Sequence, residues 1–321
     1  MKTIGIVVLH FGELSDTIEC IRSLAQSTIP VRIVIVNNDP IQEEAVKKEW
    51  NDSDVHLIHS NKNLGFSQGN NVGIAWLISN TDCDIFCIVN NDAFVDPDTL
   101  EELYNNIIAS NTIGVTVPKI LIDRNDRILW YGGGDMNWWR GGPIIPGYLG
   151  SADTPENSKM RDVSFASGCV MMMKKSVYEQ VGGFDPRYFM YVEDVDFSAK
   201  VIHNNWRIVY VPHAEVLHRV QGRKKNEMFT PLLHPKNQRL NFYAYHIFRN
   251  RALMVYENGS TTQKLQFMIV LPAVIFKLSI LCIWNFKFKA ISQVFKGLFD
   301  FWKIRNIPPS NWLNHHDKAG Y

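Results

Sequence analysis

Short apolar runs alternate with amphipathic stretches over the first 110 residues. The runs at residues 4–11, 31–36, 55–59 and 85–89 are rich in β-branched side chains and predict strands buried on both faces of a sheet. Helical spacing of the apolar positions between them predicts helices at residues 16–25, 41–50, 70–79 and 97–110. Because strand and helix alternate, we predict an α/β fold with helices on both faces of the sheet.

The pattern changes after about residue 120. Residues 131–150 are rich in Gly, Trp and Pro and predict a loop, and later segments predict a strand at 163–173, a helix at 176–181 and a strand at 207–211. One local signal concerns the first helix. Asp16 and Glu19 have the spacing of a capping box, which predicts that this helix starts at Asp16.

Composition places the chain among globular proteins, since 46% of its residues are hydrophobic and 20% are charged. The net charge of +1 gives no reason to expect a nucleic-acid partner. The charge is unevenly distributed, because Lys and Arg outnumber acids by ten to three from residue 249 onward while the remainder is acidic. We therefore predict two parts, an α/β domain at 1–248 and a basic, aromatic, mostly helical region at 249–321.

The tail has the features of a membrane-associating segment. Residues 267–284 are apolar and reach about 27 Å as a helix, but Pro272 and Lys277 interrupt them, which disfavours a full span. Downstream, Lys289, Lys296 and Lys303 recur every seven residues beside an apolar face formed by Ile291, Val294, Phe295, Leu298 and Trp302. This pattern predicts a helix lying on an anionic membrane surface. The alternative is a helical subdomain that packs its apolar faces on the body.

The cysteines and the N-terminus indicate the compartment. The five cysteines are scattered and predict neither a disulfide framework nor a zinc site. The apolar run at residues 4–9 is too short for a signal peptide. We expect a cytoplasmic protein, peripheral on the inner face of the cell membrane.

Polar residues follow the predicted strands. Ligands of open α/β sheets bind beyond the carboxyl ends of the strands. Each such residue alone is more often a turn former, but their gathering at one edge favours a binding site. These residues are His10, Asn37, Asn38, Asp39, Asn61, Asn90, Asn91 and Asp92.

Two acidic features suggest chemistry. Asp92 leaves the end of a buried strand, where a lone carboxylate suits Mg²⁺ or Mn²⁺, although an Asx turn would explain it equally well. Glu193, Asp194 and Asp196 crowd the start of a predicted helix. They either complement the helix dipole or supply a general base of raised proton affinity.

Several motifs in order resemble those of one known family. Residues 1–220 resemble a family 2 glycosyltransferase with the GT-A fold, a Rossmann-like nucleotide-binding sheet, and are most similar to its rhamnosyltransferase-like bacterial branch. The matching pieces are residues 33–39, 61–71 and 90–92, the last in place of an Asp-x-Asp motif, then Gly168, residues 183–196, His218 and residues 245–250.

The resemblance implies roles for individual residues. Asp92 would hold Mg²⁺ or Mn²⁺ on the donor diphosphate, with His218 as a second ligand or diphosphate contact; the equal alternative for His218 is a packing role at the strand end. Asp194 would be the base, and Glu193 would position the acceptor. The donor would be bound by His10, Asn37, Asn38, Asp39, Asn61, Gly65, Asn70, Asn71, Asn90 and Asn91.

Two departures from the family pattern concern the donor site. Asn37 and Asn90 stand where the family usually has Asp. An amide oxygen can still accept the N3–H of uracil or thymine, but Asn90 would weaken metal binding.

The expected function is inverting transfer of a sugar from a nucleotide diphosphate donor to a lipid-linked glycan acceptor in cell-surface polysaccharide synthesis. The resemblance favours dTDP-rhamnose as the donor, followed by UDP-sugars. One alternative is a sugar-1-phosphate nucleotidyltransferase, but residues 9–16 lack the basic loop that a triphosphate needs. The other is a non-catalytic carbohydrate-binding protein that stacks sugars on Trp130, Trp138 and Trp139.

Overall fold

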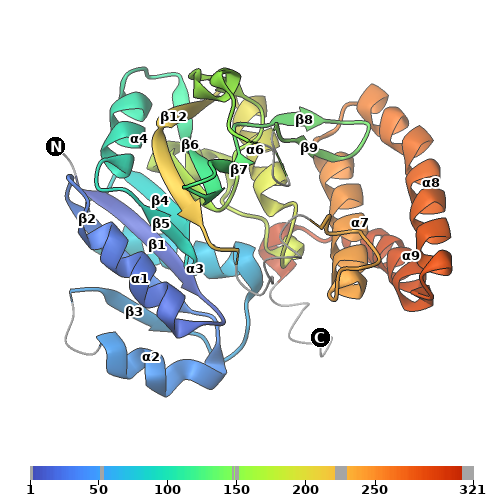
Figure 1. The fold of residues 1–321 in the computed structure, drawn as a ribbon, viewed down its shortest axis with the longest axis horizontal. Coiled ribbons are helices and arrows are strands. Elements are labelled where there is room, and N and C mark those ends of the chain that lie inside the picture. Colours follow the sequence, from blue (N-terminus) through green and yellow to red (C-terminus); the bar gives the residue numbers. More distant parts are fainter. Residues whose placement is uncertain (1–2, 51–53, 147, 149–151, 221–229, 313–321) are drawn as a thin grey trace.

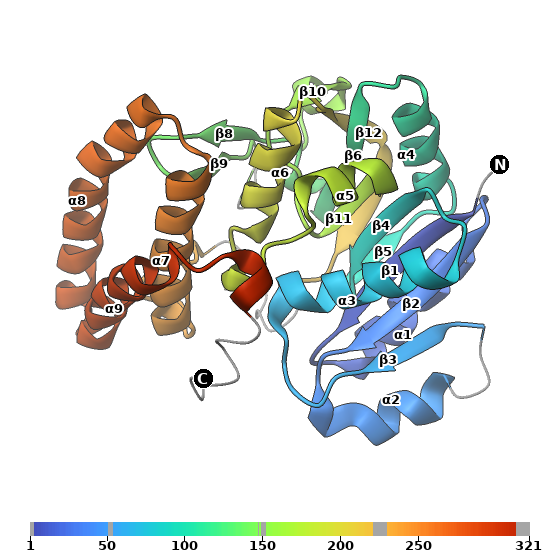
Figure 2. The ribbon, with the colours of Figure 1, turned by 180° about the vertical axis from the view of Figure 1, so that it is seen from behind.

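The computed structural model describes residues 3–50, 54–146, 148, 152–220 and 230–312. Its main feature is a mixed ten-stranded sheet on which strands follow the order β10-β12-β6-β11-β4-β1-β2-β3, with β5 paired to β12 and β7 to β6 (Figure 1). The tail forms a separate group of three helices beside the sheet (Figure 2). The predicted α/β fold is therefore confirmed.

The N-terminal half of the sheet is parallel. Strand β1 (Ile4–His10) lies between β2 (Val31–Asn37) and β4 (Ile85–Asn90), and β3 (His56–His59) forms the edge. His10 pairs with Asn37, and Asn37 with His59, so these strands end together. Their polar end residues meet at one edge of the sheet, as predicted.

Helices cover both faces of the sheet. Figure 1 and Figure 2 show α1 (Leu14–Ala25) and α4 (Thr99–Ile108) on one face and α3 (Gly65–Asn80), α5 (Lys175–Val181) and α6 (Glu193–His203) on the other, with α2 (Glu43–Trp50) beside the β3 edge. The predicted capping box is wrong. Helix α1 begins two residues before Asp16, and Asp16 and Glu19 instead form ion pairs with Arg219.

The other half of the sheet contains more strand than the sequence predicted. Here β11 (Val170–Lys174) runs antiparallel between β4 and β6 (Ile113–Asp123), and β12 (Arg207–His218) extends seven residues beyond the predicted strand. The predicted strand 163–173 is two strands, because residues 164–169 separate β10 (Arg161–Val163) from β11. Short strands β5 (Ala93–Val95) and β7 (Ile128–Tyr131) complete the sheet.

Strand β6 was missed because Pro118 and Lys119 interrupt its apolar run. The sheet tolerates Pro118 because the β12 ladder shifts register after Val211, next to this proline, and β11 pairs only with earlier residues of β6. Lys119 is buried but forms an ion pair with Asp153 at 2.7 Å. Because the register shift and the ion pair accommodate these two residues, the hydrophobic pattern alone does not predict this central strand.

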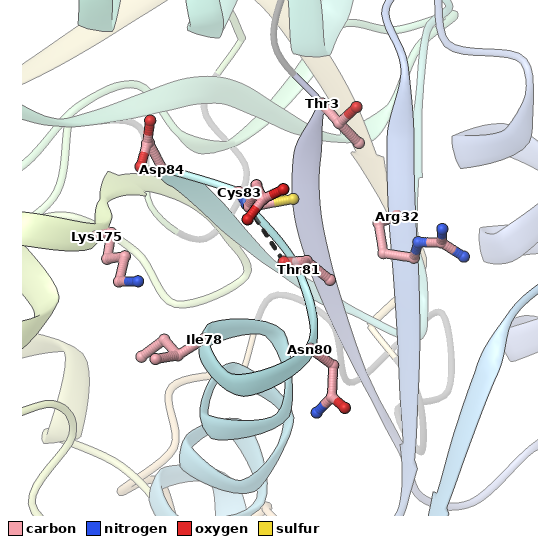
Figure 3. Close-up of a pocket in the computed structure, with 9 residues that line it drawn as sticks. Thr3, Arg32, Ile78, Asn80, Thr81, Cys83, Asp84 and Lys175 are labelled. Atoms are coloured by element: carbon pink, nitrogen blue, oxygen red, sulfur yellow. Dashed lines mark hydrogen bonds between the residues drawn. The ribbon is translucent and has the colours of Figure 1, made fainter.

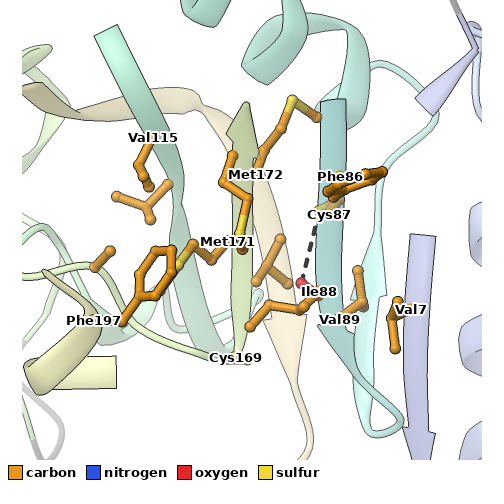
Figure 4. Packing of buried hydrophobic residues seen from close by; sticks show 14 of the residues in the cluster. Val7, Phe86, Cys87, Ile88, Val89, Val115, Cys169, Met171, Met172 and Phe197 are labelled. Carbon is orange, nitrogen blue, oxygen red and sulfur yellow. Dashed lines mark hydrogen bonds between the residues drawn. The ribbon is translucent and has the colours of Figure 1, made fainter. Parts of the chain in front are cut away.

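The core lies around the junction of β4, β11 and β6. Met171 and Met172 of β11 pack there with Cys87 and Ile88 of β4, and Phe197 of α6 approaches from one face (Figure 4). All five cysteines are buried and free, in agreement with the absence of a predicted disulfide framework.

The predicted loop at 131–150 contains a small β-hairpin, β8 (Asp135–Asn137) and β9 (Gly142–Ile144); residues 147, 149 and 150 lie outside the described part. It reaches from the sheet toward the tail helices (Figure 1). Trp138 at its turn stacks on His203 of α6. The hairpin therefore bridges body and tail.

The tail consists of α7 (Leu240–Asn258), α8 (Thr261–Trp284) and α9 (Phe288–Ile304). Gly297 lets α9 cross α7 closely, because a Cβ there would lie 2.5 Å from the carbonyl oxygen of Tyr245. One face of α9, which includes Val294 and Phe301, is buried in this way, as the subdomain alternative expected, while Phe295 and Trp302 remain exposed. The predicted apolar face of α9 is thus divided between packing and solvent.

Helix α8 is mostly unburied. Within the described residues it is the one helix long and apolar enough to cross a membrane, and 17% of its most apolar 18-residue window is buried.

Arg187 connects the body to the tail. It forms a two-pronged ion pair with Asp185, contacts Glu257 of α7 at 2.8 Å and donates to the carbonyl oxygen of Ile307. These contacts attach the tail to the body. The predicted domain boundary at residue 248 falls within α7 and stays a prediction.

Candidate active site

A cavity of about 640 Å³ opens at the carboxyl ends of β4 and β12. Its walls come from these strand ends, the first turn of α6, the β8–β9 hairpin and one side of α7. This volume is typical of sites for small ligands. Its polar and charged lining residues are Asn90, Asp92, Arg140, Ser167, Glu193, Asp194, His218, Arg239 and Arg251.

Glu193 and Asp194 form the first residues of α6 and line one wall of this cavity. The Asp194 carboxylate accepts hydrogen bonds from the backbone N–H groups of Gly168 (3.1 Å) and Val195 (2.9 Å). Gly168 has to be small, because a Cβ there would lie 2.9 Å from the ring of Phe66. The break between β10 and β11 thus supplies a backbone donor that orients Asp194.

Both carboxyl groups hold their protons more strongly than usual. Burial raises the pKa of Asp194 to about 6, although the N–H groups of Gly168 and Val195 oppose this rise. Burial also raises the pKa of Glu193 well above its usual value, and the charge of Asp194 adds to the effect. Near neutral pH, Asp194 is therefore mostly ionised, while Glu193 holds its proton more strongly than an ordinary glutamate. A carboxylate with this pKa is suited to general base catalysis.

Asp196, the third acid of the cluster, does not line the cavity. It is fully buried and forms an ion pair with Lys200 at 2.6 Å. It also accepts hydrogen bonds from Tyr188 (3.1 Å) and from Asn258 of α7 (2.7 Å). Asp196 thus connects α6 with the tail.

Asp92 and His218 form the second polar group of the cavity. Both are buried, and Oδ1 of Asp92 lies 3.2 Å from Nε2 of His218. The indole of Trp130 contacts the imidazole edge to face, with ring centroids 4.8 Å apart. Strands β4 and β12, distant in sequence, therefore bring the two predicted metal ligands together.

Asp92 and His218 contact each other at ion-pair distance, and their spacing also suits two adjacent ligands of a divalent cation. Octahedral Mg²⁺ holds ligands at about 2.1 Å, so adjacent ligand atoms are about 3 Å apart, close to the separation observed here. Among the described residues no group of three or more His, Cys, Asp or Glu side chains is placed to hold a metal. A cation here would need further oxygen ligands, and Mg²⁺ commonly takes these from phosphates and water.

Of the ten predicted donor residues, only Asn90 lines the cavity directly. His10 and Asn91 share the hydroxyl of Thr17, at 2.7 and 2.9 Å, and so connect the ends of β1 and β4 to α1. Asn71 donates to the carbonyl oxygen of Phe184 and accepts from the hydroxyl of Tyr178. The amides of Asn71 and Asn91 therefore hold the scaffold around the cavity.

The remaining predicted donor residues lie at the edge formed by β2 and the start of α3. Asn38 accepts from the N–H of Leu64 (2.7 Å) and donates to Asn63 (2.9 Å), which holds the loop before α3. On β2, Asn37 contacts His59, and Asp39 caps the turn that follows. At the start of α3, Asn70 donates to the carbonyl oxygen of Phe66, and Gly65 has a left-handed φ of 74°. Asn61 is exposed. Their assignment to the donor stays a prediction.

Sequence reasoning missed three basic residues of the cavity wall, Arg140, Arg239 and Arg251. Arg140 lies in the turn of the β8–β9 hairpin, and Arg251 lies on α7. Arg249, two residues earlier, instead donates to the carbonyl oxygen of Arg187 at 2.8 Å. Residues two apart on a helix point to nearly opposite sides, so the spacing of Arg249 and Arg251 indicates that their side chains face different surroundings.

A second hollow lies at the opposite, amino end of the parallel strands. It is lined by Thr3, Arg32, Asn80, Asp84, Lys175 and neighbouring residues. Their polar groups do not converge on one point (Figure 3). Because ligands of such sheets bind at the carboxyl ends, this hollow is not a candidate active site.

Comparison with known families agrees with the geometry. The pattern of the family "Glycosyl transferase family 2" matches residues 5–182, more than half of the chain, and that of the "N-terminal domain of galactosyltransferase" matches residues 155–224. The chain belongs to glycosyltransferase family 2. This membership favours a glycosyltransferase over the nucleotidyltransferase and carbohydrate-binding alternatives.

Curated relatives are named as hexosyl- or rhamnosyltransferases. The chain is 26% identical over 186 residues to a low-salt glycan biosynthesis hexosyltransferase, Agl10, of Haloferax volcanii, covering 58% of each chain. It is 52% identical over 58 residues to an N-acetylglucosaminyl-diphospho-decaprenol L-rhamnosyltransferase of Mycobacterium tuberculosis, covering 18% of this chain and 19% of that one. These alignments span less than two thirds of either relative.

Solved structures share the fold at low identity. GalNAc-T7 with UDP, GalNAc and Mn²⁺ aligns with 77% of this chain and 50% of its own, with a TM-score of 0.53 at 15% identity. The mannosyltransferase PcManGT of Pyrobaculum calidifontis, in complex with GDP-Man and Mn²⁺, aligns with 98% of this chain and 79% of its own, with a TM-score of 0.52 at 14% identity. The fold is GT-A, as the sequence indicated.

Proposed function

We propose that this protein is an inverting glycosyltransferase that moves a sugar, first of all rhamnose from dTDP-rhamnose, to a saccharide linked through diphosphate to a lipid. The observation that carries the proposal is one cavity in which the ionisable Asp194 faces the same space as the Asp92–His218 pair. One group suits the acceptor hydroxyl, and the other suits the departing diphosphate.

Asp194 is the proposed base. The acceptor hydroxyl oxygen attacks the anomeric carbon of the donor while its proton passes to the Asp194 carboxylate. The bond between the anomeric carbon and the phosphate oxygen breaks, and its electron pair leaves with the nucleoside diphosphate. Proton transfer of this kind contributes about 10²–10⁴-fold to the rate. Glu193, whose raised pKa favours the protonated form, lines the same cavity and is the proposed hydrogen-bond donor to the acceptor.

Asp92 and His218 are the proposed ligands of Mg²⁺ or Mn²⁺. A bound divalent cation neutralises charge on the leaving diphosphate. The nucleoside would lie toward the ends of β1 and β2, where His10, Asn37 and Asp39 are found. The relatives named as rhamnosyltransferases support dTDP-rhamnose, with UDP-sugars as the next choice.

The acceptor is proposed from the tail and from one relative. The Mycobacterium tuberculosis enzyme is named for an acceptor on diphospho-decaprenol. Helix α8 exposes Ile269, Phe276 and Ile283, spaced seven residues apart along one side. Such a face binds a membrane surface, where a lipid-linked acceptor resides. We place the protein on the cytoplasmic face of the membrane in cell-surface polysaccharide synthesis.

A nucleotide-sugar panel tests the proposal. The full-length protein is incubated with dTDP-rhamnose, UDP-sugars and GDP-sugars, with Mn²⁺, and with or without a polyprenyl diphosphate-linked N-acetylglucosamine. We expect acceptor-dependent release of nucleoside diphosphate from one donor. Release of pyrophosphate, or binding without turnover for every donor, would contradict the proposal.

A further inference from the structure

A smaller groove of about 270 Å³ adjoins the active-site cavity. We name it the side groove; it is bounded by the turn of the β8–β9 hairpin, residues 231–233, α7 and α8. Five residues line both spaces, namely Arg140, Tyr148, Leu232, Ile247 and Arg251. Beyond this junction the groove is mainly apolar, lined by Leu233, Phe248, Phe267, Leu271 and Val274.

Two arginines at the junction have no anionic partner in the described part of the protein. Neither Arg140 nor Arg251 forms an ion pair or a side-chain hydrogen bond with a described residue, whereas Arg127, Arg187, Arg207 and Arg219 all pair with acids. Arg251 is half-buried, and burial together with the charge of Arg140 lowers its pKa to about 10. Arg140 is exposed, and its repulsion of the half-buried Arg251 would be relieved by an anion bound beside both.

The order of chemistry along this path matches one ligand. From Asp194 outward, the walls change from carboxylates to the two arginines and then to apolar side chains of α7 and α8. A lipid-linked saccharide has the same order, with a sugar, a diphosphate and a hydrocarbon chain. A guanidinium binds phosphate oxygens in a bidentate fork.

We infer that Arg140 and Arg251 bind the diphosphate of the lipid-linked acceptor, with its saccharide directed to Asp194 and its first isoprene units in the side groove. This inference rests on the proposed function. The groove ends against Phe267, Leu271 and Val274 of α8, the helix whose other side exposes Ile269 and Phe276. The lipid would therefore enter from the membrane-facing side of the tail.

The donor diphosphate is the competing occupant. Of the proposed donor ligands, Asp92 lies in the turn between β4 and β5 and His218 ends β12, whereas the arginines come from the hairpin and from α7. The test therefore measures both ligands.

Binding of farnesyl diphosphate to the full-length protein tests the inference. The measurement is made in the presence of a chelator, so that no metal at Asp92 captures the diphosphate. Farnesyl monophosphate and farnesol are compared in parallel, and dTDP and UDP affinities are measured with Mn²⁺. The variants are Arg140→Gln, Arg251→Gln and Arg251→Lys, and Arg32→Gln in the distant hollow is the matched control.

Each Gln variant should weaken farnesyl diphosphate binding by about 10-fold to 100-fold, the usual effect of losing a hydrogen bond to a charged group. Arg251→Lys should retain part of the affinity, Arg32→Gln should retain all of it, and nucleotide affinity should not change. Melting temperatures should stay equal or rise in the Gln variants, which excludes misfolding.

Unchanged farnesyl diphosphate affinity in both Gln variants overturns the inference, and so does a loss confined to dTDP or UDP. Failure of the proposed function would give different results in the same experiments. Arginine-dependent farnesyl diphosphate binding without any sugar transfer would refute the function and retain the subsite. Transfer to a saccharide acceptor, combined with no binding of farnesyl diphosphate, would refute the subsite alone.

Discussion

The side-chain amide of Asn250 on α7 donates hydrogen bonds to the backbone carbonyl oxygens of Met190 and Tyr191, at 2.9 and 2.7 Å. Asn250 is completely buried. The loop that it holds contains Tyr191 and Val192 in the left-handed region, with φ values of 68° and 74°, directly before Glu193 and Asp194. Such a backbone is strained for a β-branched residue and needs external support. Helix α7 therefore helps to build the active site.

Asn250→Ala should reduce turnover while leaving nucleotide affinity unchanged, because the loop and Asp194 lose their support but the donor site does not. The lost hydrogen bonds should also lower the free energy of unfolding by about 1–3 kcal/mol. Steady-state kinetics, dTDP binding and denaturant unfolding would measure these effects. Asn80→Ala, at an exposed asparagine that bonds within its own helix, is the control. A variant with wild-type turnover would show that Asn250 only stabilises the fold.

The sequence predicted the scaffold better than the walls of the site. The strand ends at His10, Asn37 and Asn90 came together as expected, because neighbouring parallel strands end at a common edge. Helical geometry also separates Asp194 from Asp196, since residues two apart point to different sides of a helix.

Other parts of the site depend on contacts between segments distant in the chain. Asn250 and Tyr191 are about 60 residues apart, and no periodicity indicates that α7 contacts the loop before α6. Arg140 lies in a hairpin whose strands of three residues are too short to show an alternating pattern. Such residues enter the site only through tertiary packing.

Asp194→Asn should abolish transfer, with a loss of about 10²–10⁴-fold, and leave donor affinity nearly unchanged. Glu193→Gln should retain much more activity, because the raised pKa of Glu193 favours its protonated form, which an amide resembles. Single-turnover rates and donor titrations on both variants would measure the difference. If Asp194→Asn kept more than roughly a tenth of the wild-type rate, Asp194 would not be the base.

The pH dependence follows from the same carboxylate. Because the pKa of Asp194 is raised to about 6, the active ionised form is lost as the pH falls through this value. The rate at low substrate should therefore decrease about tenfold per pH unit below pH 6 and level off above it. A rate that stays constant down to about pH 4.5 would exclude Asp194 as the titrating base.

Asp92→Ala should weaken nucleotide-sugar binding only when a metal is present, because the ion would connect the carboxylate to the donor diphosphate. Donor titrations with Mn²⁺ and then with a chelator would show this. Asp98→Ala, at an exposed acid directly before α4, is the control. Equal weakening in both conditions would mean that Asp92 has a structural role.

The exposed side of α8 should bind membranes. Ile269 and Phe276 are 69% and 68% exposed, and replacing both with Gln should remove most flotation of the full-length protein with anionic vesicles. Ile41→Gln is the control, because Ile41 is 95% exposed but lies on the body. A wild-type protein that does not float at low salt would refute membrane association.

The anomeric configuration of the transferred sugar tests the central claim most directly. The full-length protein is incubated with the donor selected by the panel and a polyprenyl diphosphate-linked N-acetylglucosamine, and the product is analysed by NMR. A base that deprotonates an acceptor attacking in line predicts a single new glycosidic bond whose configuration is inverted relative to the donor. A product that retains the donor configuration would contradict the role of Asp194 and the mechanism built on it.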